Sequence, residues 1–258
     1  MASPKTRLDV LLVERSLVPS RERARAVILA GLVRVDGQVV SKAGAPVSDT
    51  ALVELTTPDH PYVGRGGLKL AHALDSFGIA VHDKRALDIG ASTGGFTDVM
   101  LKRGATDVIA LDVGHNQLDW KLRSDPRVLV REGVNARALS PVDVPHTVNI
   151  VTIDVSFISL ALILPQVPSV LAPGGDVVAL VKPQFEAGRE LVGKGGIVSD
   201  PAVHESVLKK VELAANAAGF EQCAMTPSPI AGATGNKEFL IHLRLRAPAP
   251  TSLPESLG

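Results

Sequence analysis

Four charged side chains stand beside apolar segments, where a lysine or carboxylate could act on a bound molecule. Asp154 directly follows VNIVTI and Lys182 follows DVVALV. Glu238 precedes FLIHL, and Lys69 lies upstream in GGLKLAHAL. Each of these residues alone is most simply a surface charge. Because two of them end successive predicted strands, together they point to a polar site at one edge of a sheet.

A glycine-rich segment, LDIGASTGGF, follows a predicted strand and opens a predicted helix. Glycine permits a positive φ and a close approach of the backbone, and ligands of open α/β sheets bind at the carboxyl ends of strands. The spacing differs from the dinucleotide pattern G-x-G-x-x-G, which favours a nucleoside ligand without a pyrophosphate, such as S-adenosylmethionine. A tight turn without a ligand is the alternative. The candidate contacts are Asp88, Gly90, Ala91, Ser92, Thr93, Gly94, Gly95 and Phe96.

Three further places could serve the same site. Asp112 ends the next predicted strand, IALD, where a carboxylate can accept hydrogen bonds from both hydroxyls of a ribose. It could equally cap a helix. Ser156 and Phe157 could line the mouth of the site, or they could cap the next helix and fill the core, and for Phe157 a place in the core is favoured. The stretch 187–196, AGRELVGKGG, is either a lid whose Arg189 and Lys194 meet phosphates or a plain surface loop.

Composition excludes several classes of protein. The chain has 258 residues, 45% of them hydrophobic, and no net charge, which indicates a folded core in one or two domains. One cysteine, Cys223, excludes a disulfide framework and a cysteine-based zinc site, and the seven histidines show no metal-ligand spacing. No signal peptide or transmembrane span is expected, so we predict a cytoplasmic protein without a membrane partner.

Charge is unevenly distributed along this neutral chain. Residues 1–45 hold eight Lys or Arg and four Asp or Glu, a net charge of +4. A basic N-terminal part indicates a polyanionic partner, and a solvated helix face is the alternative.

The elements that must position these residues follow from hydrophobic periodicity. Helices over 7–18 and 21–30, the second capped by Ser20, precede a hairpin around Asp36-Gly37. A linker is expected at 56–67 and a disordered tail at 247–258. Between them, apolar strands alternate with helices, which predicts a largely parallel sheet covered on both faces. The helices are expected near 68–77, 96–103, 158–171 and 202–218.

The combination of motifs resembles one known family. Residues 7–40, RLDVLLVERSLVPSRERARAVILAGLVRVDGQVV, resemble the S4 RNA-binding module, and the body resembles ribose 2′-O-methyltransferases of the FtsJ/RrmJ-like class. The set PYVGRGGLKL, LDIGASTGGFTDVML, TIDVSFISL, LVKPQFE and GGIVSDP is similar to the TlyA family of rRNA methyltransferases, whose members are often called haemolysins. The resemblance covers about residues 5–245.

The resemblance implies an α/β fold: a Rossmann-like methyltransferase domain at 68–246, with an antiparallel last strand, preceded by a small α+β S4 domain at 5–55. S-adenosylmethionine would be the cofactor, and cytidine in ribosomal RNA (16S, 23S or both) would be methylated on its 2′-hydroxyl. The family's catalytic tetrad falls on Lys69, Asp154, Lys182 and Glu238, and Asp154 would also contact the cofactor. Thr93 stands where the broader class often has proline. The RNA contacts would be Arg7, Arg21, Arg23, Arg25, Arg65, Arg189 and Lys194.

This chemistry suits the residue types. A 2′-hydroxyl is a poor nucleophile, so its methylation needs a base and alignment. We expect Lys182 to be that base, with burial and Lys69 favouring its neutral form while Asp154 and Glu238 position the lysines. No metal is required, because the leaving group is a neutral thioether. The alternatives are a non-catalytic ribosome-binding or assembly factor, a membrane-active haemolysin, and a methyltransferase for small molecules.

Overall fold

The structure is a computed structural model, and it describes residues 4–56 and 60–246. The chain divides into two compact units, Met1–Pro61 and Tyr62–Gly258. Within the described residues, no helix is both long and apolar enough to cross a membrane. The expected tail at 247–258 and residues 57–59 of the expected linker lie outside the described residues.

The first unit packs two short helices against small sheets. Its elements are β1 (Lys5–Arg7), α1 (Leu8–Glu14), α2 (Arg21–Leu29), β2 (Val33–Val35), β3 (Gln38–Val39), β4 (Pro46–Ser48) and β5 (Val53–Leu55). Strand β1 pairs with β4, and β2 lies between β3 and β5. Leu8, Leu12 and Ile28 are fully buried between the two helices and the strands. This small core holds α1 against α2.

Two predictions for the first unit, a helix cap at Ser20 and a hairpin turn at Asp36-Gly37, are confirmed, and both depend only on residues that are neighbours in the sequence. The Ser20 side chain caps α2 by accepting a hydrogen bond from Arg23 N at 3.2 Å. Asp36 and Gly37 both have positive φ, as a two-residue hairpin turn requires. Helix α1 ends at Glu14 rather than at 18, since Ser16 takes a positive φ and the chain turns toward α2.

The second unit contains a seven-stranded sheet in the order β11-β12-β10-β9-β6-β7-β8. Its strands are β6 (Arg85–Ile89), β7 (Asp107–Asp112), β8 (Val128–Glu132), β9 (Val148–Ile153), β10 (Leu171–Val181), β11 (Phe220–Pro227) and β12 (Phe239–Leu245). The five strands from β10 to β8 are parallel, while β12 runs antiparallel to β10 and to β11. The predicted α/β class and antiparallel last strand are confirmed.

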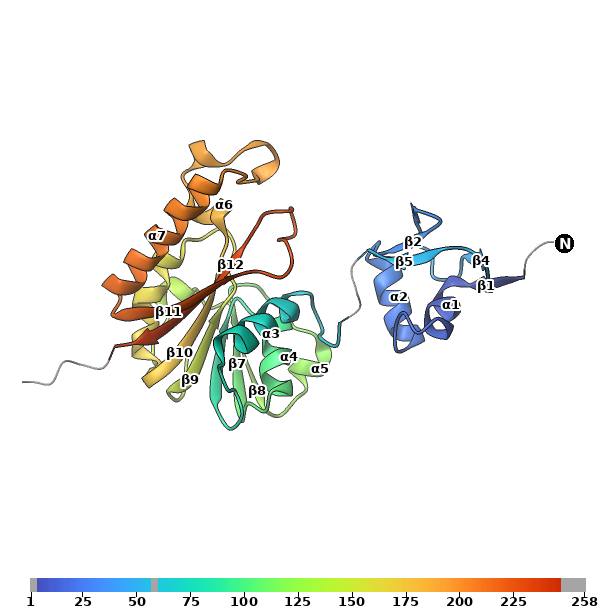
Figure 1. Ribbon diagram of the computed structural model, residues 1–258. Helices are drawn as coiled ribbons and strands as arrows, with labels where there is room; N and C mark the ends of the chain where they lie inside the picture. The colour runs from blue at the N-terminus through green and yellow to red at the C-terminus, as the bar shows by residue number, and fades with distance from the viewer. Residues whose placement is uncertain (1–3, 57–59, 247–258) are drawn as a thin grey trace, which may run out of the picture. The chain divides into compact units, whose positions relative to one another are not determined.

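Helices cover both faces of this sheet (Figure 1). They are α3 (Gly66–Phe77), α4 (Gly95–Lys102), α5 (Trp120–Arg123), α6 (Pro183–Glu186) and α7 (Pro201–Ala217). Alternation along β6 shows how each face is filled: Leu87 and Ile89 belong to the core under α7, while Ala86 belongs to the core under α3 and α4.

Three expectations about elements need correction. The helix near 158–171 is instead two 3₁₀ segments, η2 (Leu160–Leu162) and η3 (Leu164–Ser169), because Pro165 and Pro168 cannot donate the hydrogen bonds of a longer helix. Strands β8 and β11, both at sheet edges, were not predicted. Helix α3 begins at Gly66, inside the expected linker.

A buried carboxylate joins β10 and β12 at the end of the sheet opposite to Lys182. Asp176 accepts hydrogen bonds from His242 at 2.9 Å, Arg244 at 3.0 Å and Lys84 at 3.3 Å. Burial alone raises the pKa of Asp176, but the hydrogen bonds from His242 and Arg244 and the charge of Lys84 outweigh it and lower the pKa to about 2. The ionised carboxylate therefore stabilises the fold at neutral pH.

We expect Asp176→Asn to lower the free energy of unfolding by about 2 kcal/mol at pH 7. Because the folded-state pKa is depressed, this contribution is present above about pH 4 and is lost as the pH falls toward 2. Urea unfolding followed by circular dichroism at pH 7, 4 and 3 measures the difference. Glu212→Gln, which breaks an exposed pair with Lys209, is the control and should change stability little. A loss from Asp176→Asn that is equal at every pH would contradict the role of its charge.

Candidate active site

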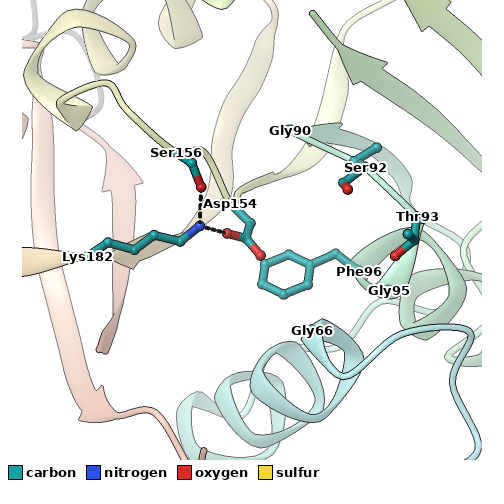
Figure 2. A pocket seen from close by; sticks show the side chains of 10 residues that line it. Gly66, Gly90, Ser92, Thr93, Gly95, Phe96, Asp154, Ser156 and Lys182 are labelled. Atoms are coloured by element: carbon teal, nitrogen blue, oxygen red, sulfur yellow. Dashed lines mark hydrogen bonds and ion pairs between the residues drawn. The ribbon is translucent and has the colours of Figure 1, made fainter. Parts of the chain in front are cut away.

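Lys182 and Asp154 meet at the carboxyl edge of the sheet. Asp154 follows β9 and Lys182 follows β10, and Lys182 Nζ lies 2.6 Å from Asp154 Oδ1. Lys182 Nζ also donates a hydrogen bond to Ser156 Oγ at 3.1 Å (Figure 2). The two charged side chains are 12% and 22% exposed, so the pair is shielded but reachable.

Lys69 and Glu238 form a second, more deeply buried pair. Lys69 lies in the first turns of α3 and donates to Glu238 Oε2 at 2.5 Å, with side chains 11% and 3% exposed. Val181 of β10 is paired with Phe239 of β12, so Glu238 lies beside Lys182 on the neighbouring strand. The structure therefore brings all four predicted tetrad residues to one edge of the sheet.

The glycine-rich loop is wedged against these residues. Gly90 has a φ of +83°, and a Cβ there would lie 2.3 Å from the carbonyl oxygen of Asp154. A Cβ on Gly95 would lie 2.9 Å from the backbone nitrogen of Gly67 in α3. Any larger residue at either position would push the loop away from β9 or α3. The glycines thus allow the loop to pass directly beside Asp154 and α3.

Asp112 holds the turn of this loop. Its Oδ2 accepts a hydrogen bond from Ser92 N at 2.8 Å and its Oδ1 accepts one from Gly114 N at 2.7 Å. The alternative role as a helix cap is wrong, because Asp119 caps the next helix, α5. Each carboxylate oxygen keeps a further acceptor site that is open to a ligand hydroxyl.

Asp88 has a different place from the one expected. Its side chain is fully buried and accepts hydrogen bonds from Thr97 Oγ1 at 2.7 Å and Thr152 Oγ1 at 2.9 Å. Burial raises the pKa of Asp88 to about 6. A side chain without exposed surface cannot contact a ligand in the cavity, so the expected direct contact is corrected: Asp88 fixes the start of the loop to α4 and β9.

Two cavities meet at the loop. The larger, about 490 Å³, has polar walls at Ser92 and Asp112 and apolar walls at Val113, Val134 and Ile163. The smaller, about 200 Å³, extends past Thr93, Phe96 and Gly66 to Lys182. Both cavities are lined by Gly90, Ser92, Asp154 and Ser156.

The residues of the larger cavity fit a nucleoside. The carboxylate of Asp112 suits the hydroxyls of a ribose, and the apolar wall suits a flat base. Asn135 and Ala136, which line this wall, were missed because the short strand β8 before them was not recognised. In the described parts of the chain, no group of three His, Cys, Asp or Glu could hold a metal ion.

Phe157 lies outside the core, which overturns the favoured expectation. It is 88% exposed, has a φ of +63°, and its ring lies 4.8 Å from that of Phe185. Glu186, in the same short helix as Phe185, accepts hydrogen bonds from Ser159 Oγ and Leu160 N at 2.6 and 2.7 Å. Burial raises the pKa of Glu186. Helix α6 thus supports the loop that displays Phe157 beside Ser156.

Asn236 is a residue of the site's surroundings that the sequence did not reveal. Fully buried, it accepts from Val198 N at 2.9 Å and donates to Gly196 O at 2.8 Å. It thereby ties the end of the 187–196 loop to the turn before Glu238. The one feature of the sequence that could have pointed to Asn236 is the Gly-Asn pair in ATGNKEF, and this pair is also typical of an ordinary turn.

The predicted RNA contacts lie on the surface of both units. Arg65, Arg189 and Lys194 are exposed in the second unit, the first of them at the N-terminus of α3. In the first unit, Arg23 lies 3.5 Å from His60. The remaining three, Arg7, Arg21 and Arg25, surround the carboxylate of Asp9.

Comparison with known proteins agrees with this geometry. An FtsJ-like methyltransferase model matches residues 62–245, and an S4 domain model matches residues 6–53. A provisionally named rRNA methyltransferase of Bacillus subtilis, YqxC, is 52% identical over 246 residues, covering 94% of this chain and 87% of that protein. The Mycobacterium tuberculosis 16S/23S rRNA (cytidine-2′-O)-methyltransferase TlyA is 46% identical over 241 residues, covering 93% and 90%.

A solved structure from Streptococcus thermophilus, provisionally named a hemolysin, superposes with a TM-score of 0.75 at 49% identity. It covers 97% of this chain and 94% of that one. The similarity therefore spans both units and not the methyltransferase part alone. The chain belongs to the TlyA family of FtsJ-like methyltransferases, which carry an S4 domain at the N-terminus.

Proposed function

We propose that this protein transfers a methyl group from S-adenosylmethionine to the 2′-hydroxyl of a cytidine in ribosomal RNA, acting in the cytoplasm. The observation that carries the proposal is the Lys182–Asp154 pair, which borders a nucleoside-sized cavity through Gly90 and Ser156. The substrate follows from the M. tuberculosis relative, which is named for cytidine-2′-O methylation of 16S and 23S rRNA.

The donor side of the site is the larger cavity. Asp112 would bind the ribose hydroxyls, and Val113, Val134 and Ala136 would enclose the adenine. When bound, S-adenosylmethionine supplies a methyl group made electrophilic by its positively charged sulfur. Gly90 and Asp154 line both cavities, so a donor bound in the larger one would place that group near the smaller cavity that Lys182 lines.

The acceptor side depends on Lys182. In its neutral form, Lys182 Nζ takes the proton of the 2′-hydroxyl as the oxygen attacks. Ser156 Oγ accepts an N–H of the same nitrogen, and the carboxylate of Asp154 lies 2.6 Å from it, so both side chains position Lys182 Nζ. Glu238 neutralises Lys69 nearby, so the two lysines can lie in one site without uncompensated charge.

An aromatic pair favours an RNA acceptor over a small molecule. Phe157 lines the larger cavity, packs against the half-buried ring of Phe185, and is held in a left-handed conformation that turns its ring toward solvent. Exposed aromatic rings bind unstacked bases of single-stranded RNA. A base resting on this pair would present its ribose to Lys182.

We expect Lys182→Ala and Lys182→Arg to lose at least about 100-fold in methyl transfer, because neither side chain can accept the proton. Labelled S-adenosylmethionine and separated ribosomal subunits that lack the modification provide the assay. Lys209→Ala, which removes an exposed lysine paired with Glu212, is the matched control and should keep full activity. Native rates in both Lys182 variants, with the fold intact, would reject the base assignment.

We expect Asp112→Ala to weaken the binding of S-adenosylmethionine by about tenfold or more, since it removes the ribose acceptor and frees the Ser92 turn. Isothermal titration calorimetry on the whole protein measures the dissociation constant. Asp125→Ala serves as the control, because Asp125 pairs with Arg127 away from the cavities. An unchanged dissociation constant in Asp112→Ala would show that the ribose is held elsewhere.

A further inference from the structure

Three arginines of the first unit share a single buried carboxylate. Arg7 donates to Asp9 through Nε at 2.9 Å and through Nη2 at 3.0 Å, a two-point contact. Arg21 Nη2 lies 3.1 Å and Arg25 Nε 3.5 Å from Asp9 Oδ2. The Asp9 side chain has no exposed surface, whereas the three arginine side chains are 52%, 53% and 57% exposed.

The fold explains why these residues meet. Arg7 precedes α1 and Asp9 lies in its first turn, while Arg21 and Arg25 stand one turn apart on α2, which packs against α1. The segment after β3 closes one side of the group: Asp9 N donates to Ala43 O at 3.0 Å, and a Cβ on Gly44 would lie 3.1 Å from Arg7 Nη1. The arginines are therefore held by both helices and by a backbone loop.

The charges in this group do not balance. A buried carboxylate is compensated by one guanidinium, yet three are placed around Asp9, which leaves two positive charges in excess. In the described residues 4–56 and 60–246, no other carboxylate forms an ion pair with Arg7, Arg21 or Arg25. Hydrogen bonds from Arg7 hold the pKa of Asp9 well below its usual range, so the carboxylate is ionised at neutral pH.

Most of the hydrogen-bonding capacity of these arginines faces outward. Each guanidinium has five N–H donors, and Asp9 accepts from two donors of Arg7 and one each of Arg21 and Arg25. Fixed guanidinium groups with unused donors match the oxygens of a phosphate. The excess positive charge and the unused donors are therefore suited to the phosphodiester of a nucleic-acid backbone.

We propose that Asp9 is a positioning residue that arranges Arg7, Arg21 and Arg25 into a phosphate-binding site for the RNA backbone. The inference rests on the proposed function and adds a condition to it: a negative charge on the protein strengthens the binding of a polyanion. Simple long-range electrostatics predicts the opposite, because removing a negative charge should favour RNA binding.

The proposal and simple electrostatics predict opposite changes in RNA binding when the charge of Asp9 is removed. Asp9→Asn and Glu22→Gln in the full-length protein therefore provide a direct test. Both variants remove one negative charge from the same unit, but Glu22 is exposed on α2 and Asp9 is buried. We expect Asp9→Asn to weaken binding to unmodified ribosomal subunits by about tenfold and to flatten its dependence on KCl concentration. Glu22→Gln should bind equally well or more tightly. If Asp9→Asn binds as Glu22→Gln does, the proposal is wrong.

A second pair of variants keeps the test valid if Asp9→Asn unfolds the first unit, which circular dichroism would reveal. Arg25→Gln leaves Asp9 paired with Arg7, and Arg34→Gln removes an exposed arginine that bonds only to Gly37 O among the described residues. We expect at least threefold weaker subunit binding for Arg25→Gln than for Arg34→Gln. Equal binding by these two variants overturns the proposal.

Methyl transfer to the subunits separates the two proposals. If the wild-type protein methylates neither ribosomal subunit, the proposed function fails. If the wild type is active while the Asp9 and Arg25 variants bind like their controls, only the role of Asp9 fails.

Discussion

The close approach of two backbone segments is the constraint on which the site depends. Gly90 runs so near to the carbonyl oxygen of Asp154 that no side chain fits between them. The pairing of β6 with β9 sets this distance, since Ile89 lies beside Ile153 immediately before the two residues. The two cavities therefore share a wall formed by Gly90 and Asp154. The cost is a loop in which Gly90 and Ser92 both take positive φ.

In the described residues, several charged side chains with little exposure share their charge with partners. Lys182 with Asp154, Lys69 with Glu238, and Asp176 with His242 and Arg244 each pair opposite charges or bring several donors to one carboxylate. Burying a single ion costs several kcal/mol, so such groups persist only with partners. Asp9 in the first unit is likewise paired, but with three arginines, so positive charges outnumber negative charges there.

The sequence was sufficient to predict those site residues whose position follows from the strand that they directly follow in the chain. Asp154 and Lys182 were placed correctly because a residue that follows a parallel strand must lie at its carboxyl edge. The Ser20 cap and the Asp36-Gly37 turn were predictable because they involve only neighbouring residues. Phe157 and Asp88 were misjudged because exposure depends on packing: the one side chain turns outward through a positive φ, and the other turns inward toward Thr97. Asn236 acts across 38 positions of sequence, beyond any local pattern.

The antiparallel strand β12 has a consequence for the order of assembly. Because it runs opposite to β10, it contributes Glu238 from its start, and the Lys69–Glu238 pair joins residues 169 positions apart. Contacts so distant in the chain form slowly and late. During synthesis on the ribosome, the Lys69–Glu238 pair cannot form until this strand has emerged and docked. The group of four charged residues at this edge of the sheet is therefore completed after the parallel strands have been made.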